Sequence, residues 1–272
     1  MTKQFGFTEN KALLANPKEF TGRINIFTFK SNCRSWVPCF VYLPPNWNPE
    51  ANYPLVLFLH GQGGDETTFQ KYVQAKQLNR WINSGEIEPV VIAGVRGDDD
   101  RENVQWFTAA NEHLLIKEMG GEFIAFCQHH FKAGEGKQQI SLEGHSRGAA
   151  GALHYYLKYP GLFASVVAMG YVSSYTLENN YRLAIEWLDQ IQEYSTPLLM
   201  EIGSHDRFVL EQNRRCSFDL HHFFIEKNID HSFELLQNVE HGFDTFWNYQ
   251  NESGLVNGLS HLQFHQRARF NK

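Results

Sequence analysis

The sequence predicts an α/β fold in which a mostly parallel, doubly wound sheet is covered by helices on both faces. Three observations predict it: short runs of consecutive apolar residues, helical stretches between these runs, and one serine motif at a strand-to-helix junction. Strands that are apolar on both faces are typical of parallel sheets buried between helices. Alternation of strands and helices indicates right-handed βαβ units, from which doubly wound sheets are built.

An antiparallel hairpin is expected at the N-terminal edge of this sheet, because two β-rich segments, 24–30 and 38–43, flank the polar stretch 31–35. The strand pattern then changes to runs that are almost continuously apolar. These runs and one further late strand are at 55–59, 90–93, 140–142, 164–169, 198–202 and 233–239.

Helical character is found at 73–84, 114–131, 147–158 and 209–228, and a final helix is expected within 248–272. The segment 171–196 is longer than a simple connection requires and contains a helical stretch near 182–194. We expect it to form a small cap insertion over the site. No linker rich in Pro, Gly or Ser interrupts the chain, so residues 1–272 are expected to form a single domain.

Composition excludes several classes of partner. The 272 residues are 42% hydrophobic, which is ample for a buried core, and the formal net charge of -6 argues against nucleic acid. The first residues lack the apolar core of a signal peptide, and the longest apolar runs are too short to span a bilayer. We therefore expect a cytoplasmic protein with no membrane contact. The four cysteines contain no CxxC pair and are expected to be free thiols.

The pentapeptide GHSRG at 144–148 carries the strongest functional signal. It follows an apolar strand and precedes a run of small, helix-compatible residues, which is the context of a nucleophile elbow with Ser146 as the nucleophile. Gly144 and Gly148 lack a Cβ, so the sharp turn can close without a clash. The alternative is an ordinary strand-to-helix connection in which Ser146 caps the helix.

A serine hydroxyl needs a histidine to take its proton and a carboxylate to orient that histidine, and in this arrangement the chain order is Ser, Asp or Glu, His. Asp206 follows the strand 198–202, and His241 follows the strand 233–239, so these two residues are the predicted acid and base. Weaker acids are Glu201 and Asp219. The histidines at 205, 231, 261 and 265 fit the base role less well because of their positions relative to the strands.

An oxyanion hole is expected where HGQGG at 60–64 follows the strand 55–59. Two backbone N–H donors must face the oxyanion of the tetrahedral intermediate. We assign them to Gln62 and to Arg147, the residue after the nucleophile; the alternative is a glycine-rich turn without this role. The Arg147 side chain could hold a substrate carboxylate, but an ion pair with Glu118 or Glu143 is the favoured interpretation.

Aromatic residues near the same sheet edge are candidates for the substrate wall. Trp106 and Phe107 follow the strand 90–93, and Tyr171 and Tyr175 begin the insertion. Loop aromatics can equally pack into the domain. The acidic run at 98–100 could gather a cation, although a solvated turn is favoured. Neither a metal-ligand spacing nor a nucleotide-binding motif is present, so no metal and no cofactor are expected.

Five motifs together resemble the esterase D-type group of α/β-hydrolases, which includes S-formylglutathione hydrolases, feruloyl esterases, tributyrin-type esterases and mycolyltransferases. They are YLPP at 42–45, LHGQGG at 59–64, GHSRG at 144–148, GSHD at 203–206, and HGF at 241–243 with Trp247. The resemblance implies an α/β-hydrolase fold and a serine carboxylesterase with Ser146, Asp206 and His241 at the triad positions. The segments 96–103 and 171–196 depart from the group's pattern, which leaves the size and shape of the substrate open.

The predicted function is hydrolysis of a carboxylic ester through an acyl-enzyme intermediate, and the expected partner is a small-molecule ester or thioester substrate. An acyltransferase or thioesterase would use the same triad and is the first alternative. A catalytically silent α/β-hydrolase that binds a small ligand is the second.

Overall fold

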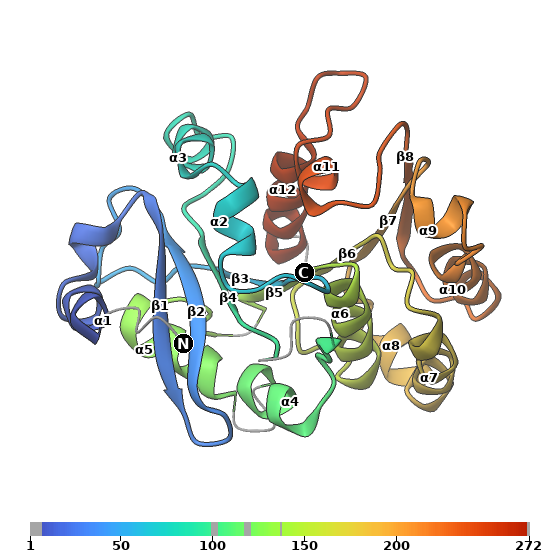
Figure 1. The fold of residues 1–272 in the computed structure, drawn as a ribbon, viewed down its shortest axis with the longest axis horizontal. Helices are drawn as coiled ribbons and strands as arrows, with labels where there is room; N and C mark the ends of the chain where they lie inside the picture. The colour runs from blue at the N-terminus through green and yellow to red at the C-terminus, as the bar shows by residue number, and fades with distance from the viewer. Residues whose placement is uncertain (1–6, 99–102, 117–120, 137, 271–272) are drawn as a thin grey trace.

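The computed structural model describes residues 7–98, 103–116, 121–136 and 138–270. Within them an eight-stranded sheet runs through the centre of the molecule in the order β1-β2-β4-β3-β5-β6-β7-β8 (Figure 1). The strands are β1 Arg23–Ser31, β2 Ser35–Leu43, β3 Leu55–Leu59, β4 Val91–Val95, β5 Ile140–His145, β6 Val166–Met169, β7 Leu198–Gly203 and β8 Ser232–Leu236. The pairs β1·β2 and β2·β4 are antiparallel and the other pairs are parallel, which confirms the predicted fold class.

Helices cover both faces of the sheet. In Figure 1, α2, α3, α11 and α12 lie above it, and α4, α5, α6, α7 and α8 lie below it. The helices are α1 Phe7–Ala15, α2 Thr68–Tyr72, α3 Ala75–Asn83, α4 Ala109–Leu115, α5 Glu122–Phe131, α6 Arg147–Lys158, α7 Ser174–Glu186, α8 Leu188–Tyr194, α9 Arg207–Leu210, α10 Cys216–Glu226, α11 Phe243–Trp247 and α12 Asn257–Phe270, with a 3-10 turn at Pro17–Phe20.

The hydrophobic core is divided into two layers by the sheet. Along β3, the side chains of Leu55, Leu57 and Leu59 enter the layer between the sheet and the helices α5 and α6. Val56 and Phe58 enter the layer between the sheet and the helices α2, α3, α11 and α12. This alternation is the period-two pattern of a strand buried on both faces. The continuous apolar runs in the sequence are therefore explained by two cores that share one sheet.

The structure refines several predicted element bounds. The helical stretch 73–84 corresponds to α3, and 209–228 becomes α9 and α10 with a loop between them. The late strand ends at Leu236 rather than at 239, so a loop separates it from His241. The short helices α2 and α11 and the N-terminal helix α1 were not predicted.

The insertion 171–196 contains all of α7 and α8. Helix α7 packs beside α6 and α10, so most of the insertion covers the flank of the domain.

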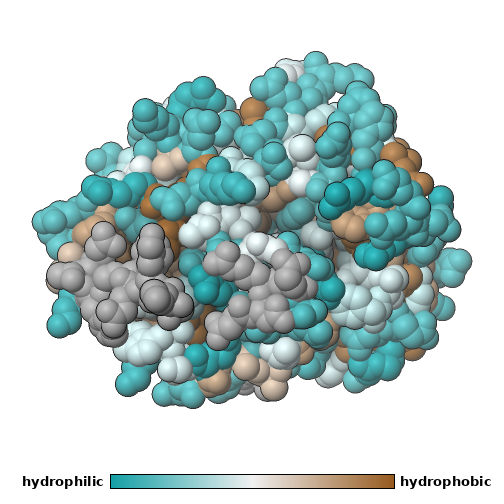
Figure 2. All heavy atoms as spheres, in the orientation of Figure 1, coloured by the Kyte–Doolittle hydropathy of each residue, from teal (hydrophilic) through white to brown (hydrophobic). Residues whose placement is uncertain are grey.

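The surface of the described chain is largely polar. On the face drawn in Figure 2, hydrophilic side chains predominate and hydrophobic ones form small separate patches. None of the helices in the described ranges is both long and apolar enough to cross a bilayer.

Candidate active site

Ser146 occupies a strained turn between β5 and α6. Its backbone has φ 57° and ψ -110°, a conformation that costs free energy for a residue with a side chain and is kept where the surrounding structure enforces it. A Cβ on Gly144 would lie 2.1 Å from the Gly148 carbonyl oxygen, and a Cβ on Gly148 would lie 1.9 Å from that of Leu59. Both glycines of the motif are thus required for the turn to form.

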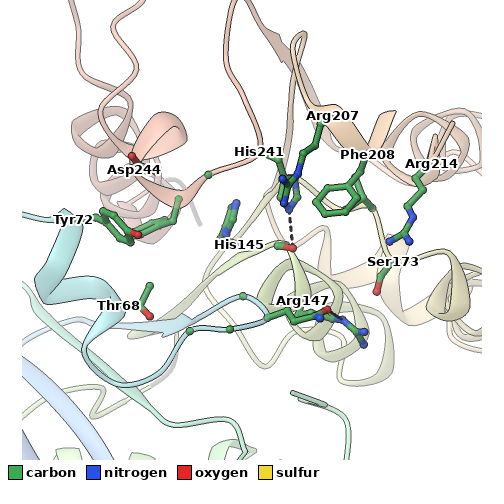
Figure 3. A pocket seen from close by; sticks show the side chains of 18 of the residues that line it. Thr68, Tyr72, His145, Arg147, Ser173, Arg207, Phe208, Arg214, His241 and Asp244 are labelled. Atoms are coloured by element: carbon green, nitrogen blue, oxygen red, sulfur yellow. Dashed lines mark hydrogen bonds between the residues drawn. The ribbon is translucent and has the colours of Figure 1, made fainter. Parts of the chain in front are cut away.

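A continuous hydrogen-bonded chain joins Ser146, His241 and Asp206. His241 Nε2 lies 2.8 Å from Ser146 Oγ (dashed in Figure 3), and His241 Nδ1 lies 2.6 Å from Asp206 Oδ2. Because an ionised carboxylate can only accept, Nδ1–H donates to Asp206 and Nε2 accepts from the serine hydroxyl. The structure therefore brings together the three residues that the sequence singled out.

The Asp206 carboxylate is fixed from two sides. It is fully buried, and its Oδ1 accepts a hydrogen bond of 2.9 Å from the backbone N–H of Phe208, which caps α9. The Phe208 ring packs edge-on against His241, with 4.6 Å between ring centroids. Of the weaker acid candidates, Glu201 is bound to Asn257 and His261 in the core and does not line the pocket.

The predicted oxyanion loop lies against the elbow. A Cβ added to Gly61 would be 3.2 Å from Ser146 Cβ, so the loop backbone passes directly beside the nucleophile. Within the described ranges, the backbone N–H groups of Gln62 and Arg147 have no hydrogen-bond acceptor. The first N–H groups of a helix have no carbonyl partner within the helix, and Arg147 is the first residue of α6. Two donors are therefore available beside Ser146.

His60 fixes the base of that loop. The buried imidazole Nδ1 is 2.9 Å from the Gly61 carbonyl oxygen, and Nε2 accepts from the backbone N–H of Gly97 at 3.0 Å. The indole N–H of Trp106 donates to the His60 carbonyl oxygen at 3.0 Å. Because these groups are buried, the loop cannot move without breaking hydrogen bonds that water would not replace.

Three predicted wall residues do not line the pocket, which corrects the sequence interpretation. Trp106 is fully buried because its indole supports the His60 loop and packs against Gly151. Tyr171 is also fully buried, with its hydroxyl bonded to Thr176 and Asn180. Phe107 is half-buried, and its ring contacts those of His154 and Tyr175, with centroids 5.5 and 6.3 Å away. Core packing is favoured for aromatics at these positions because each finds a partner inside the domain.

A pocket of about 780 Å³ opens at Ser146, a volume in the usual range for small-molecule sites. One side is formed by the loop 61–65, by α2 and by residues 242–244; the other is formed by the start of α7, by α9 and by the loop after it. In Figure 3, Thr68, Tyr72 and Asp244 lie to one side of the Ser146–His241 pair, and Phe208, Arg214 and Ser173 lie to the other. Only 172–175 of the insertion region line the pocket, so the expected cap covers it with its first residues alone.

His145 lies in the pocket wall next to the base, with 5.1 Å between the His145 and His241 ring centroids. Burial, followed by the nearby His241, lowers the pKa of His145 well below its usual range. His145 is therefore neutral at neutral pH and adds no second charge beside the imidazole that takes the proton. Its position next to Ser146 in the motif is the only sequence signal for it.

Sequence analysis did not assign several pocket-lining residues. They are Lys71 and Tyr72 at the end of α2, Arg207, Phe208 and Arg214 in and after α9, and Asp244 in α11. The favoured ion pair of Arg147 with Glu143 is not formed, because Glu143 is bound to His265 in the core. Glu118 lies outside the described residues, as do Asp99 and Asp100 of the acidic run. The part of the chain that the structure describes holds no group of three His, Cys, Asp or Glu side chains arranged to bind a metal.

Comparisons with known proteins identify the family and the fold of this chain. The sequence model of the Esterase family, described as "Putative esterase", matches residues 34–217. No curated protein matches the sequence. A ferulic acid esterase has a similar structure, with 17% identity and a TM-score of 0.74 over 90% of this chain and 98% of that one.

Two S-formylglutathione hydrolases are also similar in structure. The Staphylococcus aureus protein shows 16% identity and a TM-score of 0.65 over 90% of this chain and 97% of that one. The Agrobacterium tumefaciens protein shows 18% identity and a TM-score of 0.63 over 90% and 95% of the two chains. At these identities the likeness establishes the shared fold.

Proposed function

This chain belongs to the Esterase family and is a carboxylesterase-type hydrolase of the α/β-hydrolase fold, and we propose that it cleaves carboxylic esters through an acyl-enzyme formed on Ser146. The observation that carries the proposal is the continuous chain from Ser146 Oγ through His241 to the buried Asp206, which opens onto a pocket of substrate size. The family match includes Ser146 and Asp206, and His241 is supplied by the chain beyond it.

In the first half-reaction, Ser146 Oγ attacks the carbonyl carbon of the ester while His241 Nε2 takes the hydroxyl proton. Asp206 keeps Nδ1–H oriented and stabilises the imidazolium that forms. The negative charge on the carbonyl oxygen is bound by the backbone N–H groups of Gln62 and Arg147. When the tetrahedral intermediate collapses, the C–O bond to the alcohol breaks, and His241 returns the proton to the departing oxygen.

In the second half-reaction, water replaces the alcohol. His241 Nε2 takes a proton from the water, whose oxygen attacks the acyl carbon, and the new oxyanion is bound by the same two N–H groups. Collapse breaks the bond to Ser146 Oγ, which recovers its proton from His241, and the carboxylic acid leaves. Each oxyanion donor contributes roughly 10²- to 10³-fold in rate in enzymes of this kind.

Rapid-mixing kinetics with p-nitrophenyl acetate tests this proposal. We expect a burst of p-nitrophenol close to one equivalent per chain, followed by slower steady turnover, because the activated ester acylates Ser146 faster than water hydrolyses the acyl-enzyme. A panel of alkyl esters, methyl ferulate and S-formylglutathione then ranks acyl and leaving groups, and adding an alcohol acceptor separates hydrolysis from acyl transfer. Absence of turnover on the whole panel would contradict the proposal.

A further inference from the structure

Three arginines gather on one side of the pocket. Arg147 follows the nucleophile, and Arg207 and Arg214 lie in α9 and in the loop after it; all three line the pocket. In Figure 3, Arg214 and the end of the Arg147 side chain lie on the side of Ser146 that also holds Phe208 and Ser173, and Arg207 overlaps His241. The opposite side carries Lys71, Asp65 and Asp244, so its charges are mixed. We refer to the three guanidinium groups as the arginine cluster.

Aromatic rings hold the arginine cluster in place. The guanidinium carbons of Arg207 and Arg214 lie 5.0 and 5.1 Å from the centroid of one ring, that of Phe208. The guanidinium carbon of Arg147 lies 4.4 Å from the Tyr175 ring centroid. Such contacts are attractive and leave guanidinium edges available to bind an anion. Arg147 also donates from Nε to Gln62 Oε1 at 3.3 Å and from Nη1 to the Tyr175 hydroxyl, which further fixes its orientation. Because Phe208 also packs on His241, the cluster is fixed beside the reacting groups.

No carboxylate in the described ranges forms an ion pair with any of the three arginines. The chain as a whole has 30 acidic residues against 24 Lys and Arg residues, so its net charge does not reflect the charge at this side of the pocket. Other arginines do have acidic partners: Arg96 binds Glu66, Arg182 binds Glu186 and Arg269 binds Glu88. Arg23, Arg80, Arg215 and Arg267 form no ion pair within the described ranges either, so the distinguishing feature of Arg147, Arg207 and Arg214 is that all three line one pocket.

The unpaired cluster carries an electrostatic cost in the free protein. Burial and the nearby Arg214 both lower the pKa of Arg147, which means that Arg147 experiences the like charge of its neighbour. A bound anion would remove this repulsion and accept charge-assisted hydrogen bonds from planar guanidinium groups.

We propose that the substrate of this esterase carries a negatively charged group, such as a carboxylate, and that Arg147, Arg207 and Arg214 bind it on their side of the scissile bond. The inference rests on the proposed esterase function and specifies its substrate class. An acidic substrate would also be drawn into the pocket by the local positive charge, although the chain as a whole has a net charge of -6.

Two pairs of esters test the charge preference, one for each side of the scissile bond. Mono-p-nitrophenyl adipate and p-nitrophenyl hexanoate differ by a carboxylate on the acyl chain; p-acetoxybenzoate and its methyl ester differ by a carboxylate on the leaving group. In at least one pair we expect kcat/KM to favour the anionic ester by about tenfold or more, the usual contribution of a charge-assisted hydrogen bond. The preference should shrink as salt is raised, because the cluster is partly open to solvent.

In the double variant Arg207→Gln, Arg214→Gln, the ratio of kcat/KM between the anionic and the neutral ester should fall most of the way to one. Because it is a ratio, any effect of the substitutions that is common to both esters cancels. The matched control is Arg215→Gln, because Arg215 is adjacent in sequence, is exposed and contacts Phe218 outside the pocket lining. Both ester rates should be unchanged in this control. A ratio near one in both pairs for the wild-type protein, or a ratio fully retained in the double variant, would overturn the proposal.

A binding measurement separates this proposal from the esterase function itself. Calorimetric titration of the Ser146→Ala variant with each ester pair requires no turnover. The anionic ester should bind at least about fivefold more tightly than its neutral partner in the preferred pair, and equal affinities in both pairs would overturn the charge preference. If wild-type protein hydrolysed no ester while this difference in affinity was present, the esterase mechanism would be wrong and the anion site would remain.

Discussion

The molecule contains two hydrogen-bonded chains of serine, histidine and carboxylate, and only one of them opens to solvent. Ser146, His241 and Asp206 are joined by contacts of 2.8 and 2.6 Å. In the core between β5, β6 and α12, Ser165 Oγ lies 2.7 Å from His265 Nδ1, and His265 Nε2 lies 3.0 Å from Glu143 Oε1. The residue types and the distances are nearly the same.

The surroundings of the two chains differ. Ser165, His265 and Glu143 are at most 1% exposed, and the cavity that His265 borders measures about 10 Å³, against about 780 Å³ at Ser146. A space of that size holds no more than a water molecule. Ser146 in addition has positive φ and two unused N–H donors beside it, whereas Ser165 has an ordinary backbone.

The comparison teaches that a serine, a histidine and a carboxylate in hydrogen-bonding order do not by themselves make a reactive site. Access for the ester and donors for the oxyanion are also needed. The buried chain has a structural use, because Glu143 belongs to β5, the strand that ends at the elbow. It joins this strand to α12, and His261 joins α12 to Glu201 of β7 in the same way.

The largest expected difference between the two chains is in turnover. Ser146→Ala should reduce kcat/KM for p-nitrophenyl esters by at least about 10³-fold, because the nucleophile is lost. The melting temperature should change little, since Ser146 is only half-buried. Ser165→Ala is the matched control: its turnover should stay within a few-fold of wild type, and its stability should fall by about 1–3 kcal/mol as buried hydrogen bonds are lost. Steady-state kinetics and thermal melts of both variants measure the contrast, and similar losses of turnover in the two would contradict it.

A large stability effect is expected in the buried chain alone. His265→Ala leaves the Glu143 carboxylate in the core without its 3.0 Å partner, and breaking a buried pair in this way costs about 3–5 kcal/mol. The melting temperature should therefore fall by roughly 10 °C for a chain of this size. His222→Ala, at an exposed position of α10, is the control and should melt like wild type. An unchanged melting temperature in His265→Ala would mean that the buried chain does not support the fold.

A smaller effect should appear when the pH is raised. Burial opposes the charged form of His261, but the attraction of Glu201, its hydrogen bond and the nearby Glu143 outweigh burial and raise the pKa of His261 from 6.5 to about 9. Because the folded-state pKa is the higher one, the stabilisation is complete below pH 6.5 and is lost as pH rises through 9. The melting temperature should fall by a few degrees across this window.

The variant His261→Gln isolates this contribution, because glutamine does not titrate. Its melting temperature is expected to be lower than that of wild type at pH 6.5 and to lack the fall between pH 6.5 and 9. A variant with the same pH dependence as wild type would assign the effect to other groups.

The sequence predicted the residues of the open chain because each has a local or topological signal. Ser146 lies between two glycines that the turn requires, and Asp206 and His241 follow strands whose carboxyl ends meet at one sheet edge. The buried chain has no such signal, since its hydrogen bonds exist only once α12 packs on the sheet. His265 was considered only as a weaker base.

The pocket walls were predicted less well than the reacting groups. Much of the lining comes from α2, α9 and α11, which have four or five residues each and are too short to show a helical period. Trp106 and Tyr171 were assigned to the wall because they lie on loops near the site, but each packs into the core, where its polar atom finds a partner. Position along the chain does not distinguish these two outcomes for an aromatic side chain.

The most direct test of the account is the location of a covalent label. The protein is treated with a fluorophosphonate, which reacts with activated serine hydroxyls, and the labelled peptide is identified by mass spectrometry. We expect one label per chain, on Ser146, with none on Ser165. A protein that stays unlabelled, or a label on another serine with Ser146 unmodified, would contradict the claim that the chain through His241 activates Ser146.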